Sequence, residues 1–264
     1  MRATHAPPSL AVTALVTATA LSAGLGARTA VLAAAILVGQ MSIGWANDSI
    51  DADRDRLVGR TDKPIAAGDV TAGTVATCAA VALTAVVPIS LAVGWRPGAA
   101  HLVAVGSAWL YDLRLKETVL SWAPYALSFG LLPVIIATAL PHHPLPQLLV
   151  VGVAALLGVA AHFANTVGDT EEDARTGVRG LPQRIGPRAS MVVAGFVVVA
   201  AAGLLVAATD AATASIVAAV IAAGAVPVTL RSHARHTPFL AVIAAAGVLV
   251  VAFVVAGGDH LTAR

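Results

Sequence analysis

The chain has 264 residues, of which 58% are hydrophobic and 11% are charged, and its mean hydropathy is +0.85. Because roughly a quarter of the residues of a soluble domain are charged, this composition excludes an ordinary soluble protein and indicates a chain that resides in lipid. A single cysteine, Cys78, excludes an intrachain disulfide framework and a zinc cluster built from cysteines. The net charge of +2 is uninformative as a sum, and no nucleotide-binding loop or nucleic-acid-binding patch is recognisable.

Apolar runs rich in Ala, Val and Leu recur along the whole sequence. Their lengths approach the roughly 20 residues that a helix needs to cross a bilayer. We therefore predict an all-α integral membrane protein, with nine transmembrane helices bundled around a central cavity and a single domain over residues 1–264. In chain order, the predicted segments are 9–27, 29–48, 70–94, 98–112, 118–140, 146–166, 188–208, 211–230 and 237–257. The first could also be a cleaved signal peptide, but the second follows almost at once, which favours a membrane span.

The charged residues predict how the bundle is oriented. With a cytoplasmic N-terminus, every Lys and Arg except Arg28, Arg96 and Arg264 falls on the inner side, in agreement with the positive-inside bias. Every acidic residue except Asp210 and Asp259 falls there too, although the bias does not apply to acids. We therefore predict a multi-pass protein of the cell membrane whose acidic loops form a site on the cytoplasmic side.

The second apolar segment runs into the first of these loops, "NDSIDADRDRLVGRTDKPIAAG", which covers residues 47–68 and contains five aspartates. The 46 residues before it contain no acid. Asp48, Asp51 and Asp55 are three and four positions apart, so a helical continuation of the segment places them on one face.

The fourth segment ends in "YDLRLK", from Tyr111 to Lys116. Asp112 and Glu117 flank the basic residues Arg114 and Lys116. We expect them to be local ion partners.

A second acidic loop, "NTVGDTEEDARTGVRGLPQRIG", follows the sixth segment. Shifted by 118 positions, it aligns with the first loop without a gap. The like-for-like matches are Asn47 with Asn165, Asp51 with Asp169, Asp53 with Glu171, Asp55 with Asp173, Gly59 with Gly177, Pro64 with Pro182 and Gly68 with Gly186. The sequence thus predicts a duplicated unit of helix and acidic loop.

Two carboxylate faces at matching depth repel each other unless a cation lies between them. Hard oxygen ligands of this kind suit Mg²⁺, which commonly bridges to substrate phosphates. The alternative is that the acids belong to solvated loops, with Arg54, Arg56 and Arg175 as surface partners. The duplication favours the built site.

These motifs resemble those of the UbiA superfamily of intramembrane prenyltransferases. The first acidic loop is similar to that family's first aspartate motif, residues 169–173 to its second, "YDLRLK" to its Tyr and Lys element, and "DKPIAAG" to its Arg-Pro segment. The resemblance implies Mg²⁺-dependent transfer of a prenyl group from a prenyl diphosphate to a small, often aromatic acceptor in the membrane. It implies catalytic roles for Asp51, Asp55, Asp169, Asp173 and Lys116, with Asp48 joining the four aspartates as a metal ligand. It implies substrate contacts from Asn47, Lys63, Tyr111, Lys116 and Asn165.

Two other functions stay open on the sequence. A UbiA-type terpene cyclase would ionise the same diphosphate and let the cation close on itself. A divalent-cation transporter would use the acids for the passing ion, although transporters hold such charges near the bilayer midplane. Four aromatic residues near the acids could stabilise a carbocation or anchor the membrane interface: Trp45, Trp109, Tyr125 and Phe163. His162 could line the cavity, but helix packing is the favoured role.

Overall fold

Nine long helices make up most of the chain, for which a computed structural model describes residues 6–61, 63–231 and 237–263. They are α1 (Ala6–Ser22), α2 (Arg28–Ile50), α5 (Ala72–Val93), α6 (Trp95–Leu113), α7 (Ala123–Ala139), α8 (Leu148–Val167), α11 (Pro187–Ala208), α12 (Thr213–Arg231) and α13 (Thr237–Ala256). Each corresponds to one predicted apolar segment, so the all-α class and the helix count are confirmed for the described ranges.

The predicted segment boundaries need small corrections. The first segment ends earlier than expected, because α1 stops at Ser22 and is followed by the left-handed residues Gly24 and Gly26. The fifth segment begins later than expected. A short 3₁₀ turn, η2 (Leu115–Glu117), and further turns precede α7. Five of the described helices are long and apolar enough to cross a membrane, namely α2, α5, α8, α11 and the part of α13 from Phe239 to Ala256.

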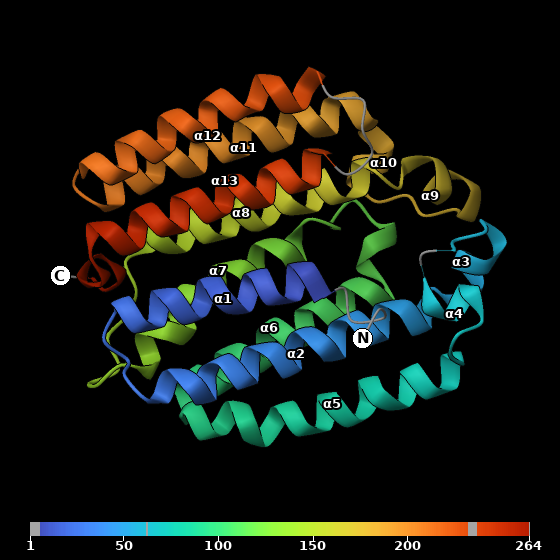
Figure 1. Cartoon of the computed structure of the whole chain (residues 1–264), viewed down its shortest axis with the longest axis horizontal. Coiled ribbons are helices and arrows are strands. Elements are labelled where there is room, and N and C mark those ends of the chain that lie inside the picture. Colours follow the sequence, from blue (N-terminus) through green and yellow to red (C-terminus); the bar gives the residue numbers. More distant parts are fainter. Residues whose placement is uncertain (1–5, 62, 232–236, 264) are drawn as a thin grey trace.

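The long helices run roughly alongside one another (Figure 1), and the contacts of α1, α2, α6, α7, α8 and α13 form a closed ring. Helix α2 packs against α5 and α6, α6 against α7, and α7 against α8, which in turn packs against α11 and α13. Helix α1 closes the ring because it contacts both α2 and α13. Its Ala20 is fully buried in the core, so α1 is an integral part of the bundle.

Small residues let helices α7 and α8 approach each other closely. A Cβ at Gly158 of α8 would lie 2.5 Å from the carbonyl oxygen of Tyr125 in α7. Close approach of this kind is typical of helices packed in a membrane. The close contact with α8 holds in place the α7 side chains that face the interior of the bundle.

The duplicated unit predicted from the sequence is visible in the backbone. Helix α2 is followed by α3 (Ala52–Leu57) and α4 (Pro64–Ala67), and α8 is followed by α9 (Thr170–Thr176) and α10 (Leu181–Ile185). The carbonyl of Asp55 accepts a hydrogen bond from the amide of Arg60, and that of Asp173 accepts one from Val178, both at 3.0 Å. The intervening Gly59 and Gly177 have φ values of +73° and +81°, which glycine adopts without steric cost. The two halves therefore end their acidic helices with the same turn.

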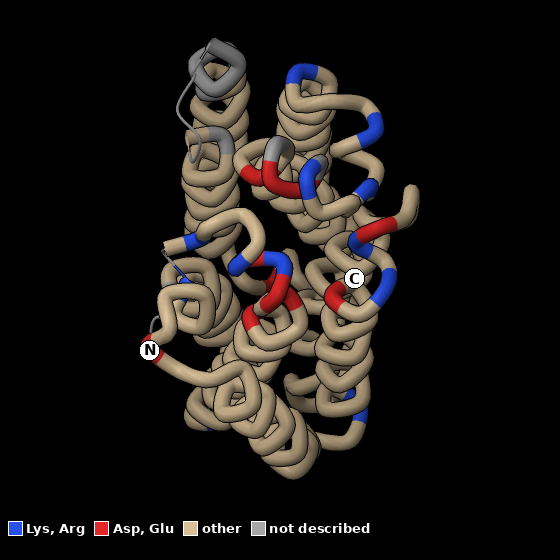
Figure 2. The backbone as a smooth tube through the Cα atoms, turned by 90° about the vertical axis from the view of Figure 1, so that its right-hand side faces the viewer, with Lys and Arg blue, Asp and Glu red and all other residues tan. Residues whose placement is uncertain are grey.

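The four short helices gather at one end of the bundle (Figure 1). Viewed from that end, acidic segments lie near the middle, with basic segments beside them (Figure 2). The charges that the sequence assigned to separate loops are thus brought together in space.

Candidate active site

A cavity of about 650 Å³ opens among these short helices and extends into the bundle. Six acidic and four basic side chains of the described residues line its charged end: Asp51, Asp55, Asp112, Asp169, Glu172, Asp173, Arg54, Arg60, Lys63 and Lys116. Farther in, the lining is mostly apolar and includes Leu15, Ile36, Leu132, Leu157 and Ile243. The cavity therefore has one end suited to a charged group and an interior suited to hydrocarbon.

The first motif lies where α2 ends. Helix α2 stops at Ile50, but the amide of Asp51 still bonds to Asn47 at 2.9 Å and the amide of Asp55 to Asp51 at 2.8 Å. The helical hydrogen-bond pattern thus crosses the break between α2 and α3. As a result, Asn47, Asp51 and Asp55 line the same cavity.

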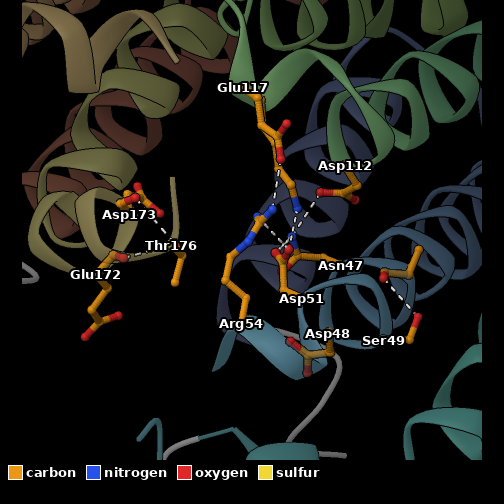
Figure 3. Close-up of polar contacts among 12 residues, drawn as sticks. Asn47, Asp48, Ser49, Asp51, Arg54, Asp112, Glu117, Glu172, Asp173 and Thr176 are labelled. Carbon is orange, nitrogen blue, oxygen red and sulfur yellow. Dashed lines mark hydrogen bonds and ion pairs between the residues drawn. The ribbon is translucent and has the colours of Figure 1, made fainter. Parts of the chain in front are cut away.

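Asp51 is the centre of a polar network that joins α2 to α6 (Figure 3). Its carboxylate accepts hydrogen bonds from Lys116 at 2.6 Å, from Arg54 at 3.0 Å and from the Asn47 amide at 3.2 Å. The same Asn47 amide donates to buried Asp112 at 2.9 Å. Asp51 therefore shares its negative charge with two cations already supplied by the chain.

Asp48 lies apart from the other acids of its motif. It is buried, its carboxylate pairs with Lys63, and it is not among the residues that line the cavity. Lys63 itself does line the cavity. This placement suits Asp48 to holding Lys63 at the site better than to contacting a metal ion.

The second motif occupies the start of α9. Asp169 is the residue before the helix, and Asp173 lies one turn further. Arg60, from the turn after α3, pairs with Glu172 at 2.8 Å and with Asp169 at 3.4 Å. Gln183 of α10 donates to Asp173 at 2.7 Å. Arg60 thus links the two duplicated units directly.

Two of the aspartates ionise less readily than an ordinary carboxyl group. Burial raises the pKa of Asp173 to about 6, and the charges of Asp169 and Asp51 add to this effect, while the Gln183 hydrogen bond opposes it. Burial also raises the pKa of Asp55, with the neighbouring Lys63 opposing the shift. Both shifts mean that additional positive charge at this end of the cavity would be stabilising.

Aromatic side chains form the wall beneath the charged end. The rings of Tyr111 and Tyr125 meet edge to face with their centroids 5.2 Å apart, and Tyr125 stacks on Phe129 at 6.4 Å. All three residues line the cavity. His162 packs against both tyrosines but does not line the cavity, and its Nε2 lies 3.0 Å from the hydroxyl of Ser121. The packing role favoured for His162 thus fits its surroundings.

Every site residue named from the sequence lines this one cavity except Asp48. The set on the cavity wall is Asn47, Asp51, Asp55, Lys63, Tyr111, Lys116, Asn165, Asp169 and Asp173. Sequence reasoning did not assign roles to Arg60, Glu172, Gln183 or Phe129. Arg60 and Glu172 could have been found from the sequence, because they flank the duplicated aspartates. No feature of the sequence indicated Gln183 or Phe129.

One expectation from the sequence was wrong. Lys116 and Glu117 are not local partners, because Lys116 pairs with Asp51 and Glu117 pairs with Arg54 at 2.9 Å. Both partners lie on the neighbouring segment where α2 meets α3 (Figure 3). Of the four aromatic residues whose role the sequence left open, Tyr125 lines the cavity, and Trp45, Trp109 and Phe163 do not.

The donor set fits Mg²⁺ that is shared with a substrate. No three His, Cys, Asp or Glu side chains of the described residues converge closely enough to hold an ion by themselves. Six acids and four bases nevertheless leave the cavity with an excess of two negative charges when all are ionised. The Oε1 atom of Gln183, beside Asp173, is buried and has no hydrogen-bond partner in the described part of the chain. Mg²⁺ commonly binds one or two carboxylates, several waters and substrate phosphates rather than an all-protein cage, which is what this arrangement offers.

Comparison with known proteins identifies the family. The model of the UbiA prenyltransferase family matches residues 6–241. This protein belongs to the UbiA prenyltransferase family. Its bundle is similar to that of a UbiA homolog from Archaeoglobus fulgidus solved with GPP and Mg²⁺, with a TM-score of 0.71, 16% identity and 98% of both chains covered. A structure concerning digeranylgeranylglyceryl phosphate synthase gives a TM-score of 0.68 at 15% identity, over 98% of this chain and 97% of the other.

A curated relative of this UbiA family protein is the 33 kDa chain of bacteriochlorophyll synthase from Cereibacter sphaeroides. It is 32% identical over 178 residues, which cover 62% of this chain and 56% of the relative. The match thus spans little more than half of the relative's length. The structural neighbours establish the shared fold, and the family match establishes membership. The resemblance seen in the acidic motifs is therefore confirmed.

Proposed function

We propose that this UbiA family protein transfers a prenyl group from a prenyl diphosphate to a small acceptor within the membrane, with Mg²⁺ as cofactor. The observation that carries the proposal is the single cavity with a charged end and an apolar interior. A prenyl diphosphate has the same division into a charged head and a hydrocarbon tail. The solved Archaeoglobus fulgidus homologs bound to GPP or DMAPP with Mg²⁺ support the same substrate class.

In this proposal the charged end binds and activates the diphosphate. Mg²⁺, when bound, supplies the positive charge that makes the diphosphate a good leaving group. Asp51, Asp55, Asp169 and Asp173 are the residues that would hold it. Lys63, Arg60 and Lys116 pair with Asp48, Glu172 and Asp51 respectively. All three line the cavity, so their cationic groups lie where phosphate oxygens would bind. Such donors stabilise the negative charge that grows as the bond breaks.

The reaction then breaks the bond between the first carbon of the prenyl chain and its oxygen. The electron pair leaves with the diphosphate, and an allylic cation remains. Tyr111, Tyr125 and Phe129 line the cavity below the acids, where an aromatic face can stabilise a cation. The surrounding apolar wall excludes water, so the acceptor's nucleophilic atom forms the new bond and loses a proton.

Four basic side chains on the cavity wall argue against cation transport: Lys63, Lys116, Arg54 and Arg60. Fixed positive charge beside carboxylates lowers their affinity for a passing cation, whereas an anionic organic head group gains from it. The short helices α3, α4, α9 and α10, which carry or flank most of these charges, lie at one end of the bundle (Figure 1), not at mid-depth as is usual for a transport site. By the positive-inside bias, we place this end on the cytoplasmic side of the cell membrane.

Single substitutions in each motif test the proposal. We expect Asp51→Ala and Asp169→Ala each to remove most diphosphate release from a prenyl diphosphate, because neither motif alone neutralises the leaving group. EDTA should abolish the activity of the wild type, and Mg²⁺ should restore it. Product analysis by mass spectrometry separates transfer to an acceptor from cyclisation of the prenyl chain.

Asp53→Ala is the matched control. Asp53 belongs to the same acidic loop, but its side chain is 93% exposed and pairs only with Arg56 in the described structure. It should keep wild-type turnover. Near-normal diphosphate release by Asp51→Ala or Asp169→Ala at saturating Mg²⁺ would show that the two-motif site is wrong.

A further inference from the structure

A histidine lies at the deep end of the cavity, among mostly apolar lining residues that also include Gln40. His101, in the second turn of α6, lines the cavity although only 5% of its surface is exposed. Its neighbours on the wall include Ile36, Gly39 and Val105. A polar side chain here has no place in the binding of a diphosphate, which lies at the opposite end.

The hydrogen bonds of His101 determine what it presents to the cavity. The hydroxyl of buried Ser90 donates to the carbonyl of Val86 at 2.6 Å, and its oxygen lies 2.8 Å from Nδ1 of His101. Because the hydroxyl proton is used on Val86, we assign the tautomer of His101 in which Nδ1 donates to Ser90. In an uncharged imidazole that donates from Nδ1, Nε2 is an acceptor. Within the described residues Nε2 has no hydrogen-bond partner.

Gly39 of α2 packs closely against this end of the imidazole ring. A Cβ at position 39 would lie 3.0 Å from Nε2 of His101 and 3.1 Å from Cγ2 of Val105. The glycine therefore lets α2 approach α6 at the level of the histidine. Because Gly39, His101 and Val105 all line the cavity, a side chain at position 39 would crowd the cavity there.

The distance from the charged end to His101 corresponds to a short prenyl chain. Asp112, beside the acids, and His101 lie on the same helix and both line the cavity. The helix rise between them is about 16 Å, which an extended chain of about three isoprenoid units would span.

We infer that His101, held by Ser90, is a polar floor that limits the length of the prenyl chain to about three isoprenoid units. The inference rests on the proposed function and adds a specificity-determining residue to it. A chain that ends above His101 leaves Nε2 accessible from the cavity. A longer chain covers Nε2 with hydrocarbon, and a buried acceptor without a partner is costly, so longer chains bind less tightly.

Binding of prenyl diphosphate analogues of increasing chain length tests whether His101 limits the length of the prenyl chain. Geranyl, farnesyl and geranylgeranyl thiolodiphosphates, which resist ionisation, are titrated into the detergent-solubilised protein with Mg²⁺ by calorimetry. We expect the wild type to bind the geranylgeranyl analogue about tenfold or more weaker than the farnesyl analogue. His101→Leu should remove most of that difference, since it replaces the polar floor with an apolar one and leaves Ser90 bonded to Val86.

Gly39→Ala provides the opposite perturbation. The added methyl group crowds the cavity beside His101, so it should weaken binding of the farnesyl analogue and leave binding of the geranyl analogue unchanged. A selective loss of this kind cannot come from misfolding, which would weaken both.

The outcomes distinguish a failure of the polar floor from a failure of the proposed function. If the wild type binds farnesyl and geranylgeranyl analogues equally, or if His101→Leu leaves their ratio unchanged, the polar floor is refuted while the proposed function stands. If the wild type binds no analogue of any length, the proposed function itself fails.

Discussion

Lys116 offers the sharpest test of how the charged end works. Its side chain is only 7% exposed, and its one hydrogen bond in the described structure goes to Asp51 at 2.6 Å. A lysine ammonium has three donors, so two remain for a diphosphate. We expect Lys116→Met, which keeps much of the stem's bulk and deletes the charge, to weaken binding of a prenyl diphosphate.

The size of the effect follows from the burial of this group. A hydrogen bond to a charged partner contributes about 1.5–3 kcal/mol, and little solvent reaches Lys116 to screen it. Loss of one such bond corresponds to a dissociation constant raised about 10- to 150-fold, since each 1.4 kcal/mol is a factor of ten. The fold should survive, because Asp51 keeps Arg54 and Asn47 as partners.

Calorimetric titration of a non-hydrolysable prenyl diphosphate with Mg²⁺ measures the binding, and a diphosphate-release assay measures turnover. Arg114→Met is the matched control, because Arg114 lies two positions away and is exposed; it should behave as the wild type. Unchanged binding and turnover in Lys116→Met would refute the assignment of Lys116 to the diphosphate. If the wild type binds no analogue and Mg²⁺ flux into liposomes rises in Lys116→Met, the protein is a cation transporter.

Two further predictions concern ionisation and orientation. Because the pKa of Asp173 is raised to about 6 in the folded protein, its contribution to stability is present at low pH and is lost as the pH rises through about 6. Asp173→Asn should therefore raise the melting temperature of the metal-free protein at pH 7.5 but not below pH ~4, and an equal or lower melting temperature at pH 7.5 would contradict the shift. Cysteines replacing Asp53 and Leu145, both exposed, in a Cys78→Ala background should react with a membrane-impermeant maleimide from opposite faces; reaction from the same face would exclude the nine-span topology.

The sequence predicted the parts of the site that depend on local spacing. Asp51 and Asp55, or Asp169 and Asp173, share a helical face because of their separation in the chain, and the shift of 118 residues predicted that the two turns would match. The glycines at 59 and 177 show why: both adopt a left-handed conformation, and a glycine repeated at the same position of two loops is typical of such a backbone.

Pairing across the bundle could not be predicted in the same way. Glu117 lies next to Lys116 in the chain, yet η2 turns the two side chains to different partners on α2 and α3. The polar floor at His101 depends on the contact of α5 with α6 and on the space left by Gly39 of α2. Such features arise from helix packing, which hydropathy and spacing do not encode.

The ion pairs at the charged end also bear on how the protein matures. Lys116 and Arg54 pair with Asp51, Arg60 pairs with Glu172 and Asp169, and Lys63 pairs with Asp48. In many small metalloproteins the ligands repel one another until the ion arrives, so that folding waits for the metal. Here the basic side chains act as built-in counter-ions for part of the negative charge, so we expect the bundle to assemble in the membrane before any Mg²⁺ is bound. Loading and loss of the metal then become reversible events of a folded protein, independent of its biosynthesis.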